Sequence, residues 1–334
     1  MQPPIRGTAA WPSRQSRISI LSGQMYPQVP GARPIGLRTI LVLSIVAFGL
    51  IALAEEVSAS ERSPAERTLR YWTPERMESA RPLEFLLDRQ GEPNLRFGRP
   101  VDGAGASFLT VPTPEVPPYS FNGRIFIEVG NKRGYCSGTA INSPSRQLVL
   151  TAGHCVNAGA EAFGNLWYRK LLFVPAYTAG KAPFGAFPAR NSKVFAPLQW
   201  RNRSNPDFDV GAFLTFPNNR SINVADAVGG GATIASGLPR GQRFATFGYP
   251  GNVKRMQGCR SSYLGDDRLS FPFPGPPTLG IGCQWAPGAS GGGWLIGDGT
   301  QINGLNSYHH VDNPTRTYSP YFTQETVGKL VEGL

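Results

Sequence analysis

Short β-type runs separated by turn residues fill positions 123–299, and no other feature limits the possible folds of this chain as strongly. In GRIFIEVG (123–130), Ile125, Ile127 and Val129 occupy alternate positions, as in a strand with one buried face. Because strands do not alternate with helical patterns, the sequence predicts an antiparallel β-domain rather than a doubly wound parallel sheet. Further runs lie between Gly, Pro and Asn turns: RQLVLTAG (146–153), KLLFVPAY (170–177), VGAFLTF (210–216), RFATFGYPG (243–251) and GGGWLIGDG (291–299).

One helix is expected at the C-terminus, in TQETVGKLVEGL (323–334). Val327, Leu330, Val331 and Leu334 follow the i, i+3, i+4, i+7 spacing of a single helix face, and Thr323 can cap the first turn. The domain therefore ends in an amphipathic helix that packs on the β-structure.

Residues 55–119 differ in composition from the β-rich part, with eight Arg, eleven acidic residues and no Cys. TPERMESA contains a helix start, with Thr73 as the cap, Pro74 at the first helical position and Glu75 in the first turn. VPTPEVPPYS (111–120) is rich in proline, which lacks an N–H group and stiffens the chain, so it resembles a linker. We expect a pro-segment or N-terminal extension over 55–119 and the main domain over 120–334.

The N-terminal 54 residues resemble a signal peptide. ILVLSIVAFGLIALA (40–54) is apolar and uncharged, Arg33 and Arg38 precede it, and Ala52-Leu53-Ala54 forms a small-residue cleavage site. Fifteen residues are short for a membrane span, which needs about 20. We expect a protein secreted to the outside of the cell or to the periplasm. A retained anchor, giving a membrane-tethered protein, is the alternative; a start at Met25 would give a leader of ordinary length.

Charge is distributed unevenly along the chain, whose formal net charge is +11. Residues 55–119 carry −3 and residues 120–334 carry +9. The basic residues of the latter are scattered, without a run of five or six, which argues against nucleic-acid binding. The opposite charges would let the two parts associate, with a passive linker as the alternative.

All four cysteines lie in the β-rich part, at Cys136, Cys155, Cys259 and Cys283. They form no CxxC motif, and no His pair has zinc-ligand spacing, so we expect no metal site. An even number of cysteines in a secreted chain predicts disulfides. Four cysteines allow three pairings, among which the sequence alone does not choose.

One serine and one histidine stand out as candidates for chemistry. Ser290 lies among glycines in PGASGGGW (287–294), a run that suits either a nucleophile loop or a tight turn. The chain has three histidines, of which His154 lies at the end of a strand in VLTAGHCV (149–156). His309 and His310 lie together near the C-terminus.

The combination of TAGHC (151–155) and GASGG (288–292) resembles the chymotrypsin-like (trypsin-like) serine proteases, and the resemblance covers about residues 120–334. CSGTAINS from Cys136, DFDVGAFL (207–214) and GYPG (248–251) match as well. The GYP sequence, the short interval around the second cysteine pair and the N-terminal extension are nearer in pattern to the bacterial glutamyl-endopeptidase-like branch than to the digestive enzymes.

The resemblance implies an all-β, two-barrel antiparallel chymotrypsin-like fold with a C-terminal helix. It implies a serine endopeptidase that hydrolyses protein or peptide substrates through an acyl-enzyme, without a cofactor and as a monomer. A catalytically inert binding protein with the protease fold is the alternative, but such proteins usually lack a member of the triad.

A rival motif, Gly288-x-Ser290-x-Gly292, fits the nucleophile elbow of α/β-hydrolases. That fold needs an acid and then a histidine after the serine, and here only His309 and His310 follow, with Asp298 as the sole intervening Asp. The chain order His154, Asp, Ser290 fits the chymotrypsin arrangement instead.

The expected triad is His154, Asp209 and Ser290. A histidine general base needs a carboxylate behind it, which fixes the tautomer and stabilises the imidazolium. Asp209 directly precedes the apolar run VGAFLTF and matches the family position. Asp207 has the same side-chain parity and is the alternative, whereas Asp266 and Asp267 in LGDDR are typical turn residues, and Asp226 is a further candidate by position.

The resemblance also assigns supporting roles. The backbone N–H groups of Gly288 and Ser290 would form the oxyanion hole, where a Cβ at position 288 would resist the required conformation. Cys136 would pair with Cys155, beside His154, and Cys259 with Cys283.

The expected substrate pocket consists of Gln284, Asn306, Ser307 and Tyr308. Arg- and Lys-specific relatives carry an Asp six residues before the nucleophile, where this chain has Gln284, so strong Arg or Lys preference is not expected. Ser307, in the wall LNSYHH (305–310), would touch the catalytic Asp. Glutamate-specific relatives place a His where this chain has Asn306. We therefore expect a preference for uncharged side chains, with Glu as the alternative.

Overall fold

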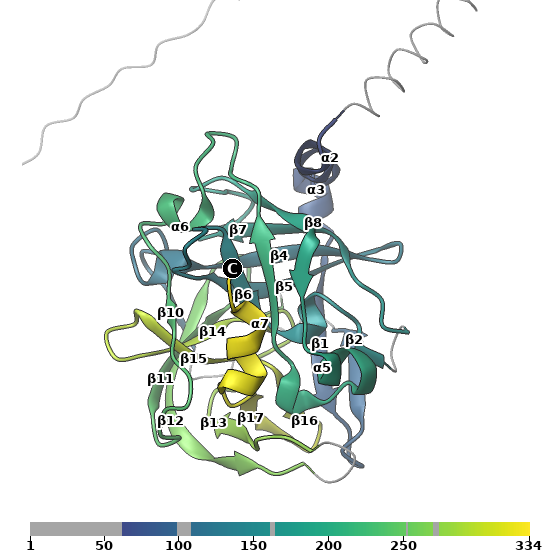
Figure 1. Cartoon of the computed structure of the whole chain (residues 1–334), viewed down its shortest axis with the longest axis vertical. Coiled ribbons are helices and arrows are strands. Elements are labelled where there is room, and N and C mark those ends of the chain that lie inside the picture. The colour runs from purple at the N-terminus through teal and green to yellow at the C-terminus, as the bar shows by residue number, and fades with distance from the viewer. Residues whose placement is uncertain (1–61, 99–107, 161–163, 252, 270–273) are drawn as a thin grey trace, which may run out of the picture. The chain divides into compact units, whose positions relative to one another are not determined.

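The computed structural model describes residues 62–98, 108–160, 164–251, 253–269 and 274–334 (Figure 1). Residues 62–334 form one compact unit. The predicted signal peptide and cleavage site lie outside the described residues. None of the helices within the described ranges is long and apolar enough to cross a membrane.

Six antiparallel strands of the first half close into a barrel. β4 pairs with β5, β5 with β6, β6 with β9, β9 with β8, β8 with β7, and β7 with β4 again. Ile125 and Ile127 are fully buried, but so is Phe126 between them, because Trp72 packs on it; β4 is therefore buried on both faces there and not on the single face that the alternating pattern predicts. The strands are β4 (Asn122–Val129), β5 (Lys132–Ala140), β6 (Leu148–Thr151), β7 (Arg169–Pro175), β8 (Phe187–Phe195) and β9 (Gly211–Thr215).

The second half forms a similar antiparallel series in the order β15-β14-β11-β12-β13-β17-β16. Leu305 N donates to Ser319 Oγ at 2.9 Å and thereby joins β15 to β17. Phe244, Trp285 and Trp294 contribute to a core inside this half. The strands are β11 (Arg243–Gly248), β12 (Gln257–Asp267), β13 (Thr278–Ile281), β14 (Gly293–Ile296), β15 (Gln301–Leu305), β16 (Tyr308–His310) and β17 (Asn313–Ser319).

The all-β, two-barrel fold expected from the sequence is thus confirmed. Two short strands extend it: β3 (Leu109–Thr110) pairs with β12, and β10 (Thr233–Ile234) pairs with β15. Short helical segments connect the strands: η1 (Tyr119–Phe121), η2 (Gly153–Cys155), α5 (Leu198–Arg203), η3 (Pro206–Phe208) and α6 (Val224–Ala227).

The chain ends in the helix that the sequence predicts, with a change of type. Thr323 accepts hydrogen bonds from the backbone of Glu325 and Thr326 and so caps a π-helical turn, η4 (Gln324–Gly328). α7 (Lys329–Val331) follows (yellow in Figure 1). Val327 is fully buried and anchors this end on the barrel core.

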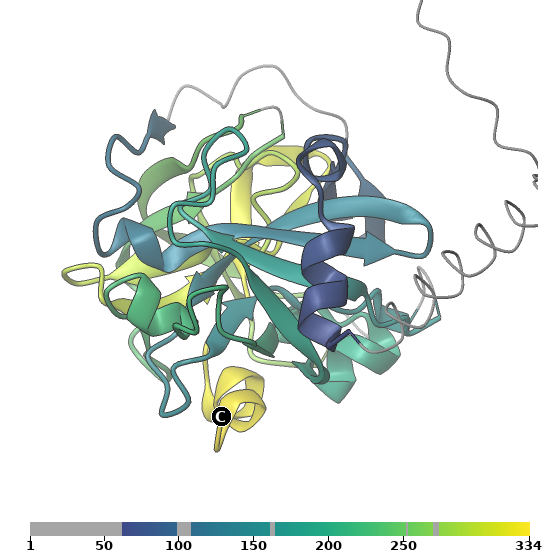
Figure 2. The same ribbon diagram turned by 90° about the horizontal axis from the view of Figure 1, so that it is seen from above.

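Residues 62–98 pack onto the barrels within the same compact unit. α2 (Pro64–Tyr71) lies on β7 and β8 (Figure 2), and α3 (Pro74–Glu78) begins after the Thr73 cap, as expected. β1 (Arg81–Leu87) and β2 (Pro93–Phe97) form an antiparallel hairpin. β1 also pairs in parallel with β5 and β16, so it bridges the two barrels.

Two disulfides brace the domain, in the pairings that the resemblance implies. Cys136 of β5 is joined to Cys155 of η2. Cys259 of β12 is joined to Cys283, which follows β13.

Candidate active site

Strand pairing brings His154 and Asp209 together. β6 and β9 are antiparallel with Thr151 opposite Gly211, so the residues just after β6 meet those just before β9. The 3₁₀ turn η2 then turns His154 toward Asp209. His154 Nδ1 lies 2.8 Å from Asp209 Oδ2, and both side chains are fully buried.

The Asp209 carboxylate makes three hydrogen bonds. Oδ1 accepts the backbone N–H of His154 at 2.7 Å, and Oδ2 accepts the hydroxyl of Ser307 at 2.5 Å as well as the bond to Nδ1. These bonds fix the orientation of the imidazole and favour the tautomer with its proton on Nδ1. His154 Nε2 is therefore the atom available as a base.

Asp207, the alternative acid, is buried at a different place. Its carboxylate packs against Gly275, where a Cβ would lie 2.6 Å from Oδ2, and its Oδ1 has no hydrogen-bond partner among the described residues. Burial raises the pKa of Asp207 to about 7, and the negative charge of Asp267 adds to the shift. The structure thus brings Asp209, and not Asp207, to His154.

The loop before β14 presents Ser290. Gly288 has φ +94°, and a Cβ there would lie 2.4 Å from Tyr135 Cε2. Gly291 has φ +81°, and a Cβ there would lie 2.0 Å from Thr151 Oγ1. Only glycine fits these two positions, because both the backbone conformation and the packed neighbours exclude a side chain.

Ser137 of β5 fastens this loop from behind. Its hydroxyl donates to the Gly288 carbonyl at 2.9 Å, and its backbone N–H donates to the Ser290 carbonyl at 2.7 Å. The same hydroxyl accepts the backbone N–H of Tyr249 at 2.9 Å. Sequence reasoning missed this role, although Ser137 lies within the CSGTAINS match.

A carbonyl of β1 occupies the space in front of Ser290. Gly288 N, one of the two expected oxyanion donors, donates to Leu83 O at 2.9 Å. Ser290 Oγ donates to the same oxygen at 3.5 Å. His154 Nε2 is buried and has no hydrogen-bond partner within the described ranges, so no hydrogen bond joins it to Ser290 Oγ.

Glu84 and Phe85, which follow Leu83 in β1, almost fill the pocket beside Ser290. The remaining volume of the pocket is about 20 Å³. Glu84 is buried there, 3.7 Å from His309 Nε2 and 2.7 Å from Arg96 Nε of β2. Burial lowers the pKa of His309, the Glu84 carboxylate opposes that shift, and the Arg96 charge adds to it. Phe85 lies with its ring 5.3 Å from the His154 ring.

Three of the four predicted pocket residues line this pocket: Asn306, Ser307 and Tyr308. Gln284 is exposed and does not line it. Asn306 turns its polar atoms away, toward Trp294 Nε1 (2.7 Å) and Ala289 O (3.1 Å). His309 also lines the pocket: the sequence placed it close to the wall but did not count it among the pocket residues, and it lies where the pairing of β16 with β17 is irregular.

Tyr308 connects the pocket wall, β16, to β12 and β13 by hydrogen bonds. Its hydroxyl donates to Asp267 Oδ2 at 2.8 Å and lies 2.8 Å from Thr278 Oγ1. His310 Nε2 lies 2.6 Å from the same Asp267 oxygen, and this bond raises the pKa of His310. β16 is thereby fixed by side-chain bonds where its pairing with β17 is irregular.

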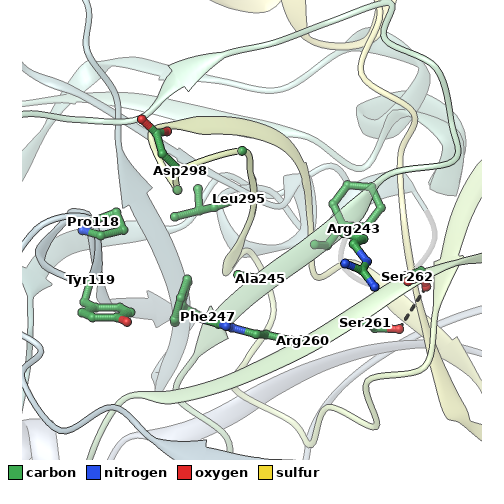
Figure 3. Close-up of a pocket in the computed structure, with 13 residues that line it drawn as sticks. Pro118, Tyr119, Arg243, Ala245, Phe247, Arg260, Ser261, Ser262, Leu295 and Asp298 are labelled. Atoms are coloured by element: carbon green, nitrogen blue, oxygen red, sulfur yellow. Dashed lines mark hydrogen bonds between the residues drawn. The ribbon is translucent and has the colours of Figure 1, made fainter.

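A larger hollow of about 580 Å³ lies elsewhere on the second barrel (Figure 3). Arg243, Phe247 and Arg260 line it from β11 and β12, and Leu295 and Asp298 line it from β14 and the turn that follows. None of the predicted triad or pocket residues lies in it, so its size does not identify it as the site of the chemistry.

No protein-family model matches the sequence, and no curated protein sequence does. Among solved structures the chain is similar to the protease Anisep from Arthrobacter nicotinovorans, with 30% identity, a TM-score of 0.56 and coverage of 63% of this chain and 93% of that one. It is similar to the thermostable serine protease AL20 from an extremophilic microorganism, with 28% identity, a TM-score of 0.55 and coverage of 64% and 98%.

A Glu endopeptidase has the same fold, with 20% identity, a TM-score of 0.54 and coverage of 69% of this chain and 96% of that one. These likenesses extend over nearly the whole length of the three relatives. The chain belongs to the chymotrypsin-like serine proteases and is a serine-type endopeptidase that acts on protein or peptide substrates.

Proposed function

We propose that this endopeptidase is secreted and cleaves peptide bonds through a triad of Ser290, His154 and Asp209. The observation that carries the proposal is the buried His154–Asp209 pair beside a loop whose Gly288 N–H already holds a peptide carbonyl, 3.5 Å from Ser290 Oγ. A hydroxyl nucleophile, a base with a fixed tautomer and an oxyanion donor are the groups that acyl transfer needs.

In this mechanism Ser290 Oγ attacks the substrate carbonyl carbon while its proton passes to His154 Nε2. The carbonyl oxygen becomes an oxyanion, which the N–H groups of Gly288 and Ser290 stabilise. His154 Nε2 then gives the proton to the leaving amine, and an ester on Ser290 remains. Water, deprotonated by the same nitrogen, hydrolyses this ester and regenerates the hydroxyl. The Asp209 carboxylate stabilises the imidazolium in both half-reactions.

The pocket supports a preference for glutamate, the alternative that the sequence left open. Its present occupant is the Glu84 side chain, and the domain's own positively chargeable group there is His309, 3.7 Å from that carboxylate. The net charge of +9 over residues 120–334 also favours acidic substrates.

Secretion is supported by the apolar segment 40–54 and by the two disulfides, which persist mainly in oxidising compartments. The N-terminal sequence of protein recovered from the culture medium of a secreting host would test cleavage after Ala54. An intact segment 40–54 on membrane-bound protein would support the tethered alternative.

The test of the triad is covalent labelling with a fluorophosphonate. Prolonged incubation with excess reagent should give one adduct, at Ser290, and Ser290→Ala should take none. Absence of an adduct at Ser290 even after prolonged incubation would favour the inert binding protein.

A further inference from the structure

We propose that the β1–β2 hairpin, residues 81–97, is an autoinhibitory plug that lies in the substrate cleft with its chain direction reversed relative to a substrate. The inference rests on the proposed triad and concerns regulation of the same site. It is carried by three independent features: the carbonyl in the oxyanion site, the side chain in the pocket and the direction of the strand pairing.

The first feature is the Leu83 carbonyl. It accepts the Gly288 N–H at 2.9 Å and lies 3.5 Å from Ser290 Oγ. A substrate carbonyl under attack needs this same donor, so the hairpin and a substrate exclude each other.

The second feature is the side chain that fills the pocket. In a substrate, the residue that supplies the carbonyl also places its own side chain in the specificity pocket. Here the carbonyl belongs to Leu83, and the buried side chain in the pocket belongs to the following residue, Glu84. Attack at the Leu83 carbonyl would make Glu84 the first residue of the leaving fragment. In a substrate, however, the pocket holds the residue that supplies the carbonyl, so Glu84 lies on the wrong side of the bond.

The third feature is the strand direction. The chain after Leu83 runs along the pocket wall, where Leu86 and Leu87 pair in parallel with His309 and His310, and Val311 N donates to Leu87 O at 2.9 Å. The chain before it leads away to β5, with Arg81 opposite Gly134. Since the pocket side of a protease cleft receives the residues before the scissile bond, β1 is bound backwards.

A backward strand explains how the hairpin stays in the cleft without being cut. Attack at Leu83 would expel a leaving group that is itself held in the pocket by Glu84. Phe85 packs over the His154 ring at 5.3 Å and against Trp200 at 5.1 Å, which keeps solvent and substrate from the general base. Ser290 Oγ points to the carbonyl oxygen instead of His154 Nε2, so the nucleophile is not activated.

The hairpin is held by burial along almost its whole inner edge. Leu83, Phe85, Leu86 and Leu87 are each at most 2% exposed. Arg96 of β2 pairs with Glu84 across the hairpin and adds to the retention of its carboxylate.

A second anchor lies upstream of the hairpin. Trp72 packs on Phe126 of β4, with 5.4 Å between ring centroids, and its indole N–H donates to Lys170 O at 2.5 Å. The hairpin is therefore attached at the cleft, and the segment before it is attached to the first barrel.

The test measures the initial rate of fluorophosphonate labelling of the intact full chain. Glu84→Arg places a third basic group beside Arg96 and His309 in the pocket and should release the hairpin. Glu92→Arg is the matched control, because it makes the same change on an exposed side chain of the same hairpin. We expect Glu84→Arg to label at least tenfold faster than the wild type, and Glu92→Arg to label within twofold of it.

Phe85→Ala provides a second route to release if Glu84→Arg does not fold, and it should also raise the labelling rate of intact chain. Equal rates for the wild type and both release variants would overturn the plug. No label on any variant after prolonged incubation would instead overturn the triad itself, and the plug with it.

The reversed direction has a readout of its own. Mass spectrometry of the wild-type chain over time should show no cut between Leu83 and Glu84 beyond that in Ser290→Ala. A Ser290-dependent cut at this bond would show that β1 binds as a substrate and would overturn the backward orientation.

Discussion

The hydroxyl of Ser137 donates a hydrogen bond to the carbonyl of Gly288 at 2.9 Å, which links the first barrel to the loop that carries Ser290. The same oxygen accepts the Tyr249 N–H, so one small side chain joins three segments that are far apart in the sequence. This bond holds the peptide group before Ala289 in place, and with it the orientation of the neighbouring oxyanion donor.

Ser137→Ala should therefore lower kcat by tenfold to a hundredfold and change KM little. The buried Tyr249 N–H and Gly288 carbonyl would each lose a partner, at a cost of about 1–3 kcal/mol. Steady-state hydrolysis of a small ester checks this. Ser262→Ala, on an exposed side chain, is the control, and an unchanged kcat in Ser137→Ala would contradict the role.

The acid of the triad can be tested by a pair of substitutions two residues apart. Asp209→Asn should reduce kcat by at least a thousandfold, because the amide no longer holds the productive tautomer of His154. Asp207→Asn should retain activity within a few-fold, since its side chain lies against Gly275 and not His154. The reverse outcome in ester hydrolysis would identify Asp207 as the acid.

Asp207 should instead control stability as a function of pH. Its folded-state pKa of about 7 lies above the unfolded value of 3.8, so the native state binds more protons between these values. The free energy of unfolding should then fall as pH rises from about 4 to 7, by on the order of 3–4 kcal/mol. Asp207→Asn should remove most of this slope in urea unfolding, and the exposed Asp312→Asn should not. Parallel pH profiles for wild type and Asp207→Asn would refute the assignment.

The glutamate preference can be tested at His309. His309→Asn should lower kcat/KM at least tenfold for substrates with Glu before the scissile bond, because the imidazole 3.7 Å from the pocket carboxylate is lost. It should leave kcat/KM for the corresponding Gln substrates nearly unchanged. The measurement is the ratio of the two kcat/KM values for each enzyme. A preference for Arg or Lys in the wild type would exclude a pocket that selects acidic side chains.

The sequence alone predicted those parts of the proposed site that depend on local backbone geometry. Ser290 stands out because its loop needs glycine at 288 and 291, where φ is positive. Such a requirement is visible in the sequence because it concerns residues next to one another in the chain. His154 stands out because it directly follows a strand and precedes a cysteine. The alternation in β4 likewise predicted a strand, since side-chain parity follows from local geometry alone.

Tertiary structure determined those features of the site that depend on contacts between segments distant in the sequence. Asp207 and Asp209 have the same parity, and only the family resemblance favoured Asp209; the register of β6 on β9 and the turn η3 place Asp209, and not Asp207, beside His154. His309 lines the pocket at a point where the pairing of β16 with β17 is irregular, whereas Gln284 is exposed outside the pocket.

The hairpin in the cleft had no local signal at all. Leu83 and Gly288 are separated by about two hundred residues, and the sequence suggested only that opposite charges could bring their segments together. Pairing over that distance depends on the summed burial of Leu83, Phe85, Leu86 and Leu87 against both barrels, a free energy that exists only once the barrels have formed.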